Sequence, residues 1–108
     1  MTLDETRRVY TQMKASSCQA LMDDLVKAGV RYARLRVDWL LTPPEEWNEL
    51  NQERTRAHNT FIDACNILSR AMQKAGEDNT WRARIGEDRK AIGDFACHLH
   101  CLLGIMAR

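Results

Sequence analysis

The residues best suited to chemistry lie close together near the C-terminus. His100 and Cys101 follow Cys97 by three and four residues, so one face of an α-helix presents all three side chains. Thiolates and imidazoles are ligands that suit zinc, and Cys65 or His58 is available as a fourth ligand. The chain has no CxxC pair of the kind that structural zinc sites use. We therefore expect packing residues and no cofactor, with a metal-binding helical protein as an alternative.

No catalytic constellation can be assigned from the sequence. A histidine base needs a nucleophile or a paired acid, and Asp63 falls on the opposite side of the same predicted helix from His58. The carboxylates Glu46, Glu49 and Glu53 lack the Glu-x-x-His motif of di-metal helical bundles. A glycine-rich phosphate loop and a dinucleotide-binding fingerprint are both absent. These observations favour a protein that is not an enzyme.

Arg31, Arg34 and Arg36 form the one local concentration of positive charge, with aromatic residues interleaved. This pattern makes a nucleic-acid-binding accessory protein an alternative function. The whole chain carries a net charge of +1, from 16 basic and 15 acidic residues, which gives no argument for a polyanionic partner. We therefore expect these arginines to form ion pairs, with the acidic segment 45–53 as their partner.

A narrow polar stripe runs along segment 43–75, which is otherwise apolar around most of its circumference. Asn and Asp are unusual in the middle of a helix, because their side chains compete for backbone hydrogen bonds. One interpretation is a solvated face, and the other is an interaction surface for a protein partner. The residues of this predicted surface, the polar stripe, are Arg56, Asn59, Asp63, Asn66 and Arg70.

The same segment is predicted to be one long central helix. Thr42 followed by two prolines and Glu45 matches a capping box with proline at the first helical position. Gly76 can adopt the left-handed conformation that ends a helix. A helix over 43–75 would span about 50 Å at 1.5 Å per residue.

Three further segments have helical signals. A first helix is predicted over 3–28, starting at a capping box on Thr2 and ending at Gly29, with a bend or a change of packing partner near 15–17. A last helix is predicted over 88–105, starting at Asp88 or a neighbour. Residues 30–41 fit either a strand or a helix. We favour a helix, because the chain offers no second strand to pair with; pairing across a dimer would be the exception.

Length and composition set the remaining bounds. A chain of 108 residues, 44% hydrophobic and 29% charged, is predicted to be a single helical domain, 1–108. The expected fold is all-α, a small helical bundle of three main helices and one shorter helix around the long helix. The first residues do not resemble a signal peptide and no stretch is long enough to span a bilayer. We therefore expect a cytoplasmic protein with no membrane partner and with reduced cysteines.

The last helix carries a second face of small residues, formed by Gly93, Cys97, Cys101 and Gly104. Glycine inside a helix costs about 1 kcal/mol relative to alanine, so this face predicts a closely packed neighbour. The neighbour would be the first helix or a second copy of the protein. Together with the length of the central helix, this predicts a homodimer. The function that we favour is a non-enzymatic protein-interaction or regulatory module.

Overall fold

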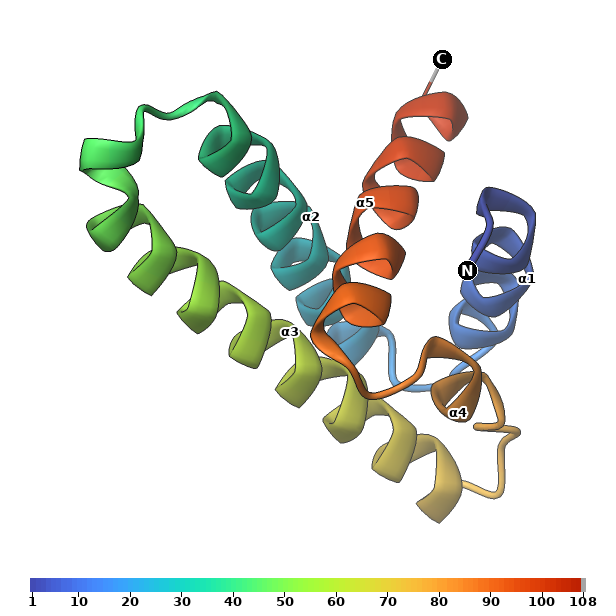
Figure 1. Cartoon of the computed structure of the whole chain (residues 1–108). Helices are drawn as coiled ribbons and strands as arrows, with labels where there is room; N and C mark the ends of the chain where they lie inside the picture. Colours follow the sequence, from blue (N-terminus) through green and yellow to red (C-terminus); the bar gives the residue numbers. More distant parts are fainter. Residues whose placement is uncertain (108) are drawn as a thin grey trace.

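The computed structural model describes residues 1–107 and confirms the all-α fold (Figure 1). Its helices follow in the order α1 (Leu3–Lys14), α2 (Gln19–Leu41), the single 3-10 turn η1 (Pro44–Glu46), α3 (Trp47–Lys74), α4 (Trp81–Ile85) and α5 (Arg89–Met106). No helix within residues 1–107 has both the length and the apolar character needed to cross a bilayer.

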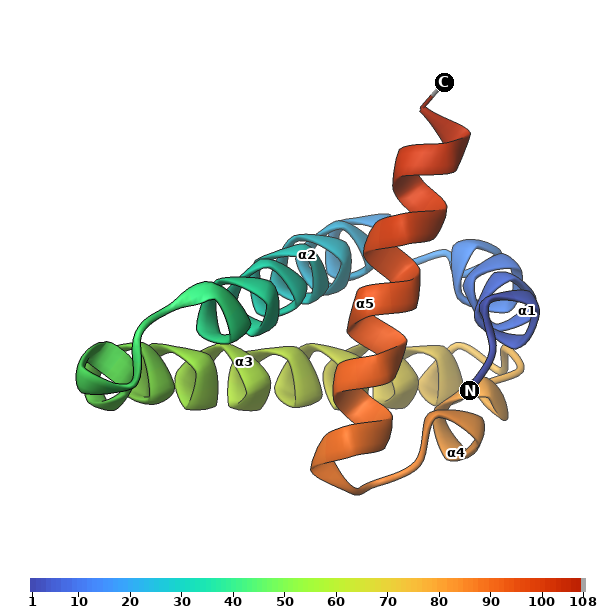
Figure 2. The ribbon, with the colours of Figure 1, turned by 45° about the horizontal axis from the view of Figure 1, so that its top comes forward.

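A long hairpin of α2 and α3 forms the frame of the molecule. The two helices run side by side, and α5 crosses the hairpin steeply near its middle (Figure 2). Helix α1 packs against α5, and α4 lies between α1 and the end of α3 (Figure 1). The opposite end of the hairpin, where α2 turns into α3, projects beyond the other helices (Figures 1 and 2).

The core lies where α2, α3 and α5 meet. Phe61 of α3 stacks on Phe95 of α5 with ring centroids 5.8 Å apart, and the ring of Tyr32 lies 6.4 Å from Phe61. All three side chains are almost fully buried. Trp81 of α4 extends this core under the end of α3 and donates its indole N–H to the sulfur of Met72 at 3.3 Å.

The predicted first helix over 3–28 is wrong, because the expected bend near 15–17 is a complete break between α1 and α2. The buried hydroxyl of Ser16 accepts a hydrogen bond from the Cys18 backbone N–H at 2.9 Å. The carboxylate of Glu77, from the α3–α4 turn, accepts the backbone N–H of Ser17 at 2.9 Å. These bonds satisfy backbone groups that a continuous helix would have used itself.

Gly29 does not end a helix, contrary to the prediction. It is a buried residue inside α2, so residues 30–41 are helical, as expected, but they continue one helix that begins at Gln19. A Cβ atom on Gly29 would lie 2.9 Å from Cε1 of Phe61 and 3.2 Å from Cδ2 of Leu99. The absence of a side chain at Gly29 therefore allows three helices to approach closely. This packing offsets the conformational cost of a glycine inside a helix.

The start of the long helix differs from the prediction, while its end and the starts of the first and last helices agree with it. The Thr42 hydroxyl donates to the Asp38 carbonyl of α2 at 2.6 Å and does not cap α3, which begins only at Trp47. Gly76 has a positive φ of 73° at the predicted end. The predicted caps Thr2 and Asp88 accept the backbone N–H groups three residues later. With 28 residues, α3 spans about 42 Å at 1.5 Å per residue.

Replacing Gly29 by alanine should destabilise the protein, because the buried Phe61 ring has little room to move away from the new methyl group. Alanine favours a helix by about 1 kcal/mol over glycine, but overpacking a core costs about 1–3 kcal/mol. Gly104 is the matched control, since it lies within α5 and no atom of residues 1–107 is found within 4 Å of an added Cβ.

Urea unfolding of the two variants measures this difference. Gly104→Ala should raise the free energy of unfolding by up to about 1 kcal/mol, whereas Gly29→Ala should lower it. An equal gain in both variants would show that the α2–α3–α5 junction is looser than described.

Candidate functional site

The predicted metal ligands on α5 are not brought together. The Cys97 sulfur accepts a hydrogen bond from Nη1 of Arg36 at 3.4 Å, while His100 and Cys101 are exposed to solvent. Within residues 1–107, no group of three His, Cys, Asp or Glu side chains is placed to hold a metal ion. All four cysteines are free thiols.

Cys65 and His58, the possible fourth ligands, lie in the core and at its edge. Cys65 is fully buried, and its burial raises the pKa of the thiol from 9.0 to about 12. His58 packs edge-on against Tyr32, with ring centroids 5.3 Å apart. Its Nδ1 atom lies 3.2 Å from the side-chain oxygen of Asn59. Both arrangements are those of packing residues.

The face of small residues on α5 is divided into two halves. Its first half packs on α2, because a Cβ on Gly93 would lie 2.6 Å from the guanidinium carbon of Arg36. The close neighbour of this half is therefore α2, near Arg36. This part of α2 lies outside the predicted first helix over 3–28. The second half, at Cys101 and Gly104, is open to solvent.

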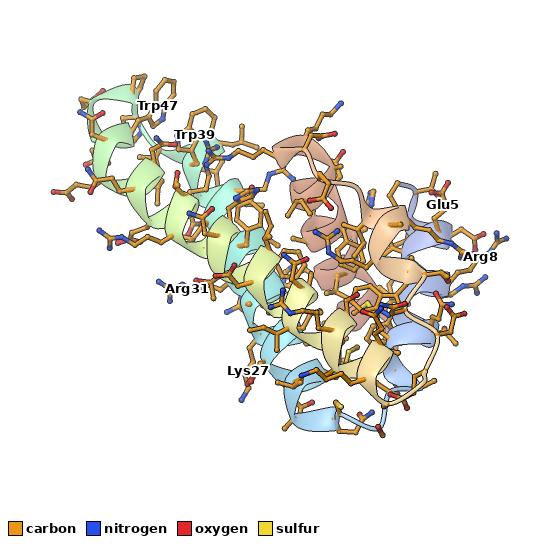
Figure 3. All side chains as sticks on the ribbon, turned by 90° about the horizontal axis from the view of Figure 1, so that it is seen from below. Glu5, Arg8, Lys27, Arg31, Trp39 and Trp47 are labelled. Carbon is orange, nitrogen blue, oxygen red and sulfur yellow. The ribbon has the colours of Figure 1, made fainter. Side chains whose placement is uncertain are left out.

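The three predicted basic residues on α2 do not share one surface. Arg31 and Arg34 are exposed on the outer side of α2, and Figure 3 shows Arg31 pointing away from the protein. Arg36 turns inward, and its Nη1 atom lies 3.5 Å from Oδ1 of Asp94 on α5. The expected ion-pair partner for Arg36 in segment 45–53 is therefore wrong.

The polar stripe on α3 lies on the outer face of the hairpin. Arg56, Asn59, Asp63 and Arg70 are exposed. Asn66 has a structural partner, since its side-chain oxygen accepts Nε–H of Arg82 on α4 at 2.7 Å. Next to the stripe, α2 and α3 form a shallow, mostly apolar groove lined by Leu21, Asp24, Ala28, Thr60, Asp63, Ala64 and Ile67.

Four exposed apolar side chains at the turn between α2 and α3 were not singled out from the sequence as a surface. Leu40 and Leu41 are 74% and 79% exposed, and Val37 and Trp47 beside the same turn are 52% and 37% exposed. We call these four residues the hairpin tip. Leu40 follows the buried Ala33 by seven residues, so it continues the core face of α2 past the point where α5 covers it. The sequence pattern places Leu40 on the apolar face of its helix, but the exposure of its side chain depends on where α5 crosses the hairpin.

Aromatic stacking holds the hairpin tip in shape. The rings of Trp39 and Trp47 stack with centroids 4.9 Å apart, and Figure 3 shows the two side chains together at the end of the hairpin. The Trp47 indole N–H donates to the Thr42 carbonyl at 2.9 Å. The guanidinium carbon of Arg54 lies 4.3 Å from the centre of the Trp39 ring, within cation–π range.

Negatively charged side chains lie beside the hairpin tip, on the α3 side. A shallow depression there is lined by Thr42, Glu45, Glu46, Asn48, Glu49, Leu50 and Glu53. Glu45 and Glu46 belong to η1, and Glu49 and Glu53 lie in the first turns of α3, where carboxylates complement the positive end of the helix dipole. The hairpin tip is thus an exposed apolar surface next to an acidic one.

Comparison with protein-family models, with curated proteins and with solved structures finds no match to this chain.

The buried thiol of Cys65 predicts a specific pH dependence of stability. The pKa of this thiol is raised from 9.0 to about 12 in the folded protein. The contribution of the neutral, buried thiol to the free energy of unfolding is therefore fully present below pH 9 and is lost as the pH rises towards 12. Over that interval, the stability advantage of the native protein over Cys65→Ala should shrink by up to about 1.4 kcal/mol per pH unit.

Urea unfolding at several alkaline pH values tests this expectation. Cys101→Ala is the control, because the Cys101 side chain is exposed to solvent, and its difference from the native protein should stay constant. A constant difference for Cys65→Ala as well would show that Cys65 is accessible to water.

Proposed function

We propose that this chain is a non-enzymatic protein-interaction module and that the hairpin tip is its docking surface. The observation that carries the proposal is the exposure of Leu40 and Leu41, at 74% and 79%, on a tip held in place by stacked tryptophans. Contiguous exposed apolar residues mark interaction sites on soluble proteins. Trp47 adds a large aromatic side chain of the type that anchors interfaces.

The charges around the hairpin tip define the class of partner. Four glutamates, Glu45, Glu46, Glu49 and Glu53, line the adjacent depression. An apolar surface with an acidic border complements an amphipathic helix that has leucine-like residues on one face and lysine or arginine beside them. We therefore assign a basic amphipathic helix of another protein as the occupant.

The polar stripe on α3 is the second candidate surface. We propose Arg56, Asn59, Asp63 and Arg70 as this second interaction surface. The apolar groove that includes Asp63 supports that proposal. Asn66 contributes less, because its oxygen is engaged by Arg82. The hairpin tip exposes more apolar surface on each residue, and apolar burial drives most protein association.

Two further proposals concern the state of the protein in the cell. A cytoplasmic location is supported by the four free thiols. A homodimer is supported by the uncovered end of α5, where Ile105 and Met106 are about half exposed beside Val30 and Leu103. A dimer through the hairpin tip would instead bring two acidic borders together.

The alternative functions have narrower support. A nucleic-acid contact would have to use Arg31 and Arg34, which share their surface with Asp38 and Glu53. A metal site would have to assemble from side chains that are separate in this structure.

The docking proposal predicts that polar substitutions at the hairpin tip weaken binding strongly without unfolding the protein. A synthetic helical peptide of leucine and lysine with an amphipathic pattern is the probe, and Trp47 fluorescence reports its binding. The double variant Leu40→Ser/Leu41→Ser should bind about 100-fold more weakly, since interface anchors contribute more than about 1 kcal/mol each. Both residues are exposed, so the melting temperature should stay nearly unchanged.

A stripe variant, Arg56→Ser/Asp63→Ser/Arg70→Ser, is the matched comparison. It should bind the peptide about as well as the native chain. If the stripe variant loses binding and the tip variant retains it, the docking surface is the polar stripe.

The dimer proposal predicts a mass of twice 12.5 kDa in light scattering at high concentration. Ile105→Asp should return the protein to the monomer, because it buries an unpaired charge in the interface. Leu40→Asp at the hairpin tip serves as the control and should leave the dimer intact. A single species of 12.5 kDa at every concentration would rule out the dimer.

A further inference from the structure

Arginine side chains from three helices converge at one junction. Arg36 comes from α2, Arg54 from α3, and Arg89 is the first residue of α5. Nη2 of Arg89 donates to Oγ1 of Thr55, the neighbour of Arg54 in the chain, at 3.1 Å. Arg36 lies against Gly93, which is one helical turn after Arg89 on the same side of α5. The three guanidinium groups therefore face a common region.

Positive charge at this junction is only partly compensated. Among residues 1–107, Arg36 has one carboxylate nearby, that of Asp94 at 3.5 Å, and neither Arg54 nor Arg89 has a carboxylate within 4.0 Å. Burial lowers the pKa of Arg54, and the charges of Arg89 and Arg36 lower it further, while Tyr32 acts in the opposite direction. Three guanidinium groups and one carboxylate leave a net charge of about +2.

The junction also contains buried donors that lack acceptors. Nε of Arg54 and Nε1 of Trp39 are both buried, and neither has a hydrogen-bond partner among the described residues. The two groups are neighbours, because the Arg54 guanidinium lies over the Trp39 ring. A buried donor without an acceptor costs about 1–3 kcal/mol. An acceptor that reached these donors after a movement of the Arg54 side chain would remove this cost.

We propose that this junction binds a phosphate group, carried by inorganic phosphate or by a small phosphate ester, through the guanidinium groups of Arg36, Arg54 and Arg89. A doubly charged oxyanion matches the net charge, whereas a monocarboxylate would leave one positive charge uncompensated. Guanidinium groups bind phosphate oxygens through paired N–H donors. The positive end of the α5 dipole adds to the attraction. This site is separate from the docking function proposed for the hairpin tip.

Titration of the full chain with inorganic phosphate at constant ionic strength tests the proposal. Phosphate should raise the melting temperature in a saturable manner and change the fluorescence of Trp39, on which Arg54 packs. Sulfate should act similarly, and acetate should bind at least about 10-fold more weakly because it carries one charge. The absence of saturation, or equal binding of acetate, would overturn the assignment. Glycerol 1-phosphate, titrated in parallel, identifies the source: tighter binding than phosphate indicates an ester, and weaker binding the free ion.

Substitutions distinguish this site from a general effect of charge. Arg54→Gln and Arg89→Gln should each weaken phosphate binding by about 10-fold or more. Each substitution also removes a contact, that of Arg54 with Trp39 and Asn51 or that of Arg89 with Thr55, so the stability of the unliganded variants is measured alongside. Arg31→Gln, on the outer side of α2, should bind phosphate normally.

Gly93→Ala provides a test at constant net charge. Its new methyl group would displace the Arg36 guanidinium, since the Cβ position lies 2.6 Å from the guanidinium carbon. Phosphate binding should therefore weaken, with the stability of the unliganded variant measured alongside. If Arg31→Gln weakens binding as much as Arg54→Gln, and Gly93→Ala has no effect, the protein attracts phosphate only through its overall charge and the proposal fails.

Discussion

The arrangement of the helices depends on one close contact at Gly29. With no side chain there, the Phe61 ring of α3 and the Leu99 side chain of α5 both reach the backbone of α2. Phe61 in turn stacks on Phe95, so this contact joins the three longest helices in one core. Tight packing of this kind cannot yield to a larger residue without moving a helix.

The position of this contact determines which surfaces remain uncovered. Helix α5 crosses the hairpin near its middle, and the core face of α2 continues past the crossing to Leu40 (Figure 2). The C-terminal turns of α5 likewise extend past their neighbours, leaving Ile105 and Met106 half exposed. Both exposed apolar surfaces therefore have the same origin. They are continuations of core faces beyond the places where the helices cross.

Sequence patterns predicted the helical class and most helix ends, because those depend on local signals. The caps at Thr2 and Asp88 and the end at Gly76 are examples. Predictions failed where a residue distant in the sequence determines the local structure. Gly29 ends no helix because Phe61 needs its space, and the break after α1 is completed by Glu77, 60 residues away in the chain from Ser17. No periodicity contains such information.

The same limit applies to the candidate sites. The predicted stripe residues are mostly exposed, but the partner of Asn66 on α4 could not be inferred from the sequence. Arg36 was grouped with Arg31 and Arg34 by proximity in the chain, while the fold joins it to Arg54 and Arg89 instead. Convergence of charges from three helices is a property of the tertiary structure.

The stack of Trp47, Trp39 and Arg54 joins the hairpin tip to the arginine junction, and this connection has a thermodynamic consequence. Trp39 is in contact with both Trp47 and the Arg54 guanidinium. An anion that immobilises Arg54 therefore also restricts Trp39, and a partner seated on Trp47 restricts the same ring from the other end. Linkage requires that any change one ligand makes to the affinity of the other is reciprocated by the same factor. Two small binding surfaces on this hairpin would thus act as a single coupled system.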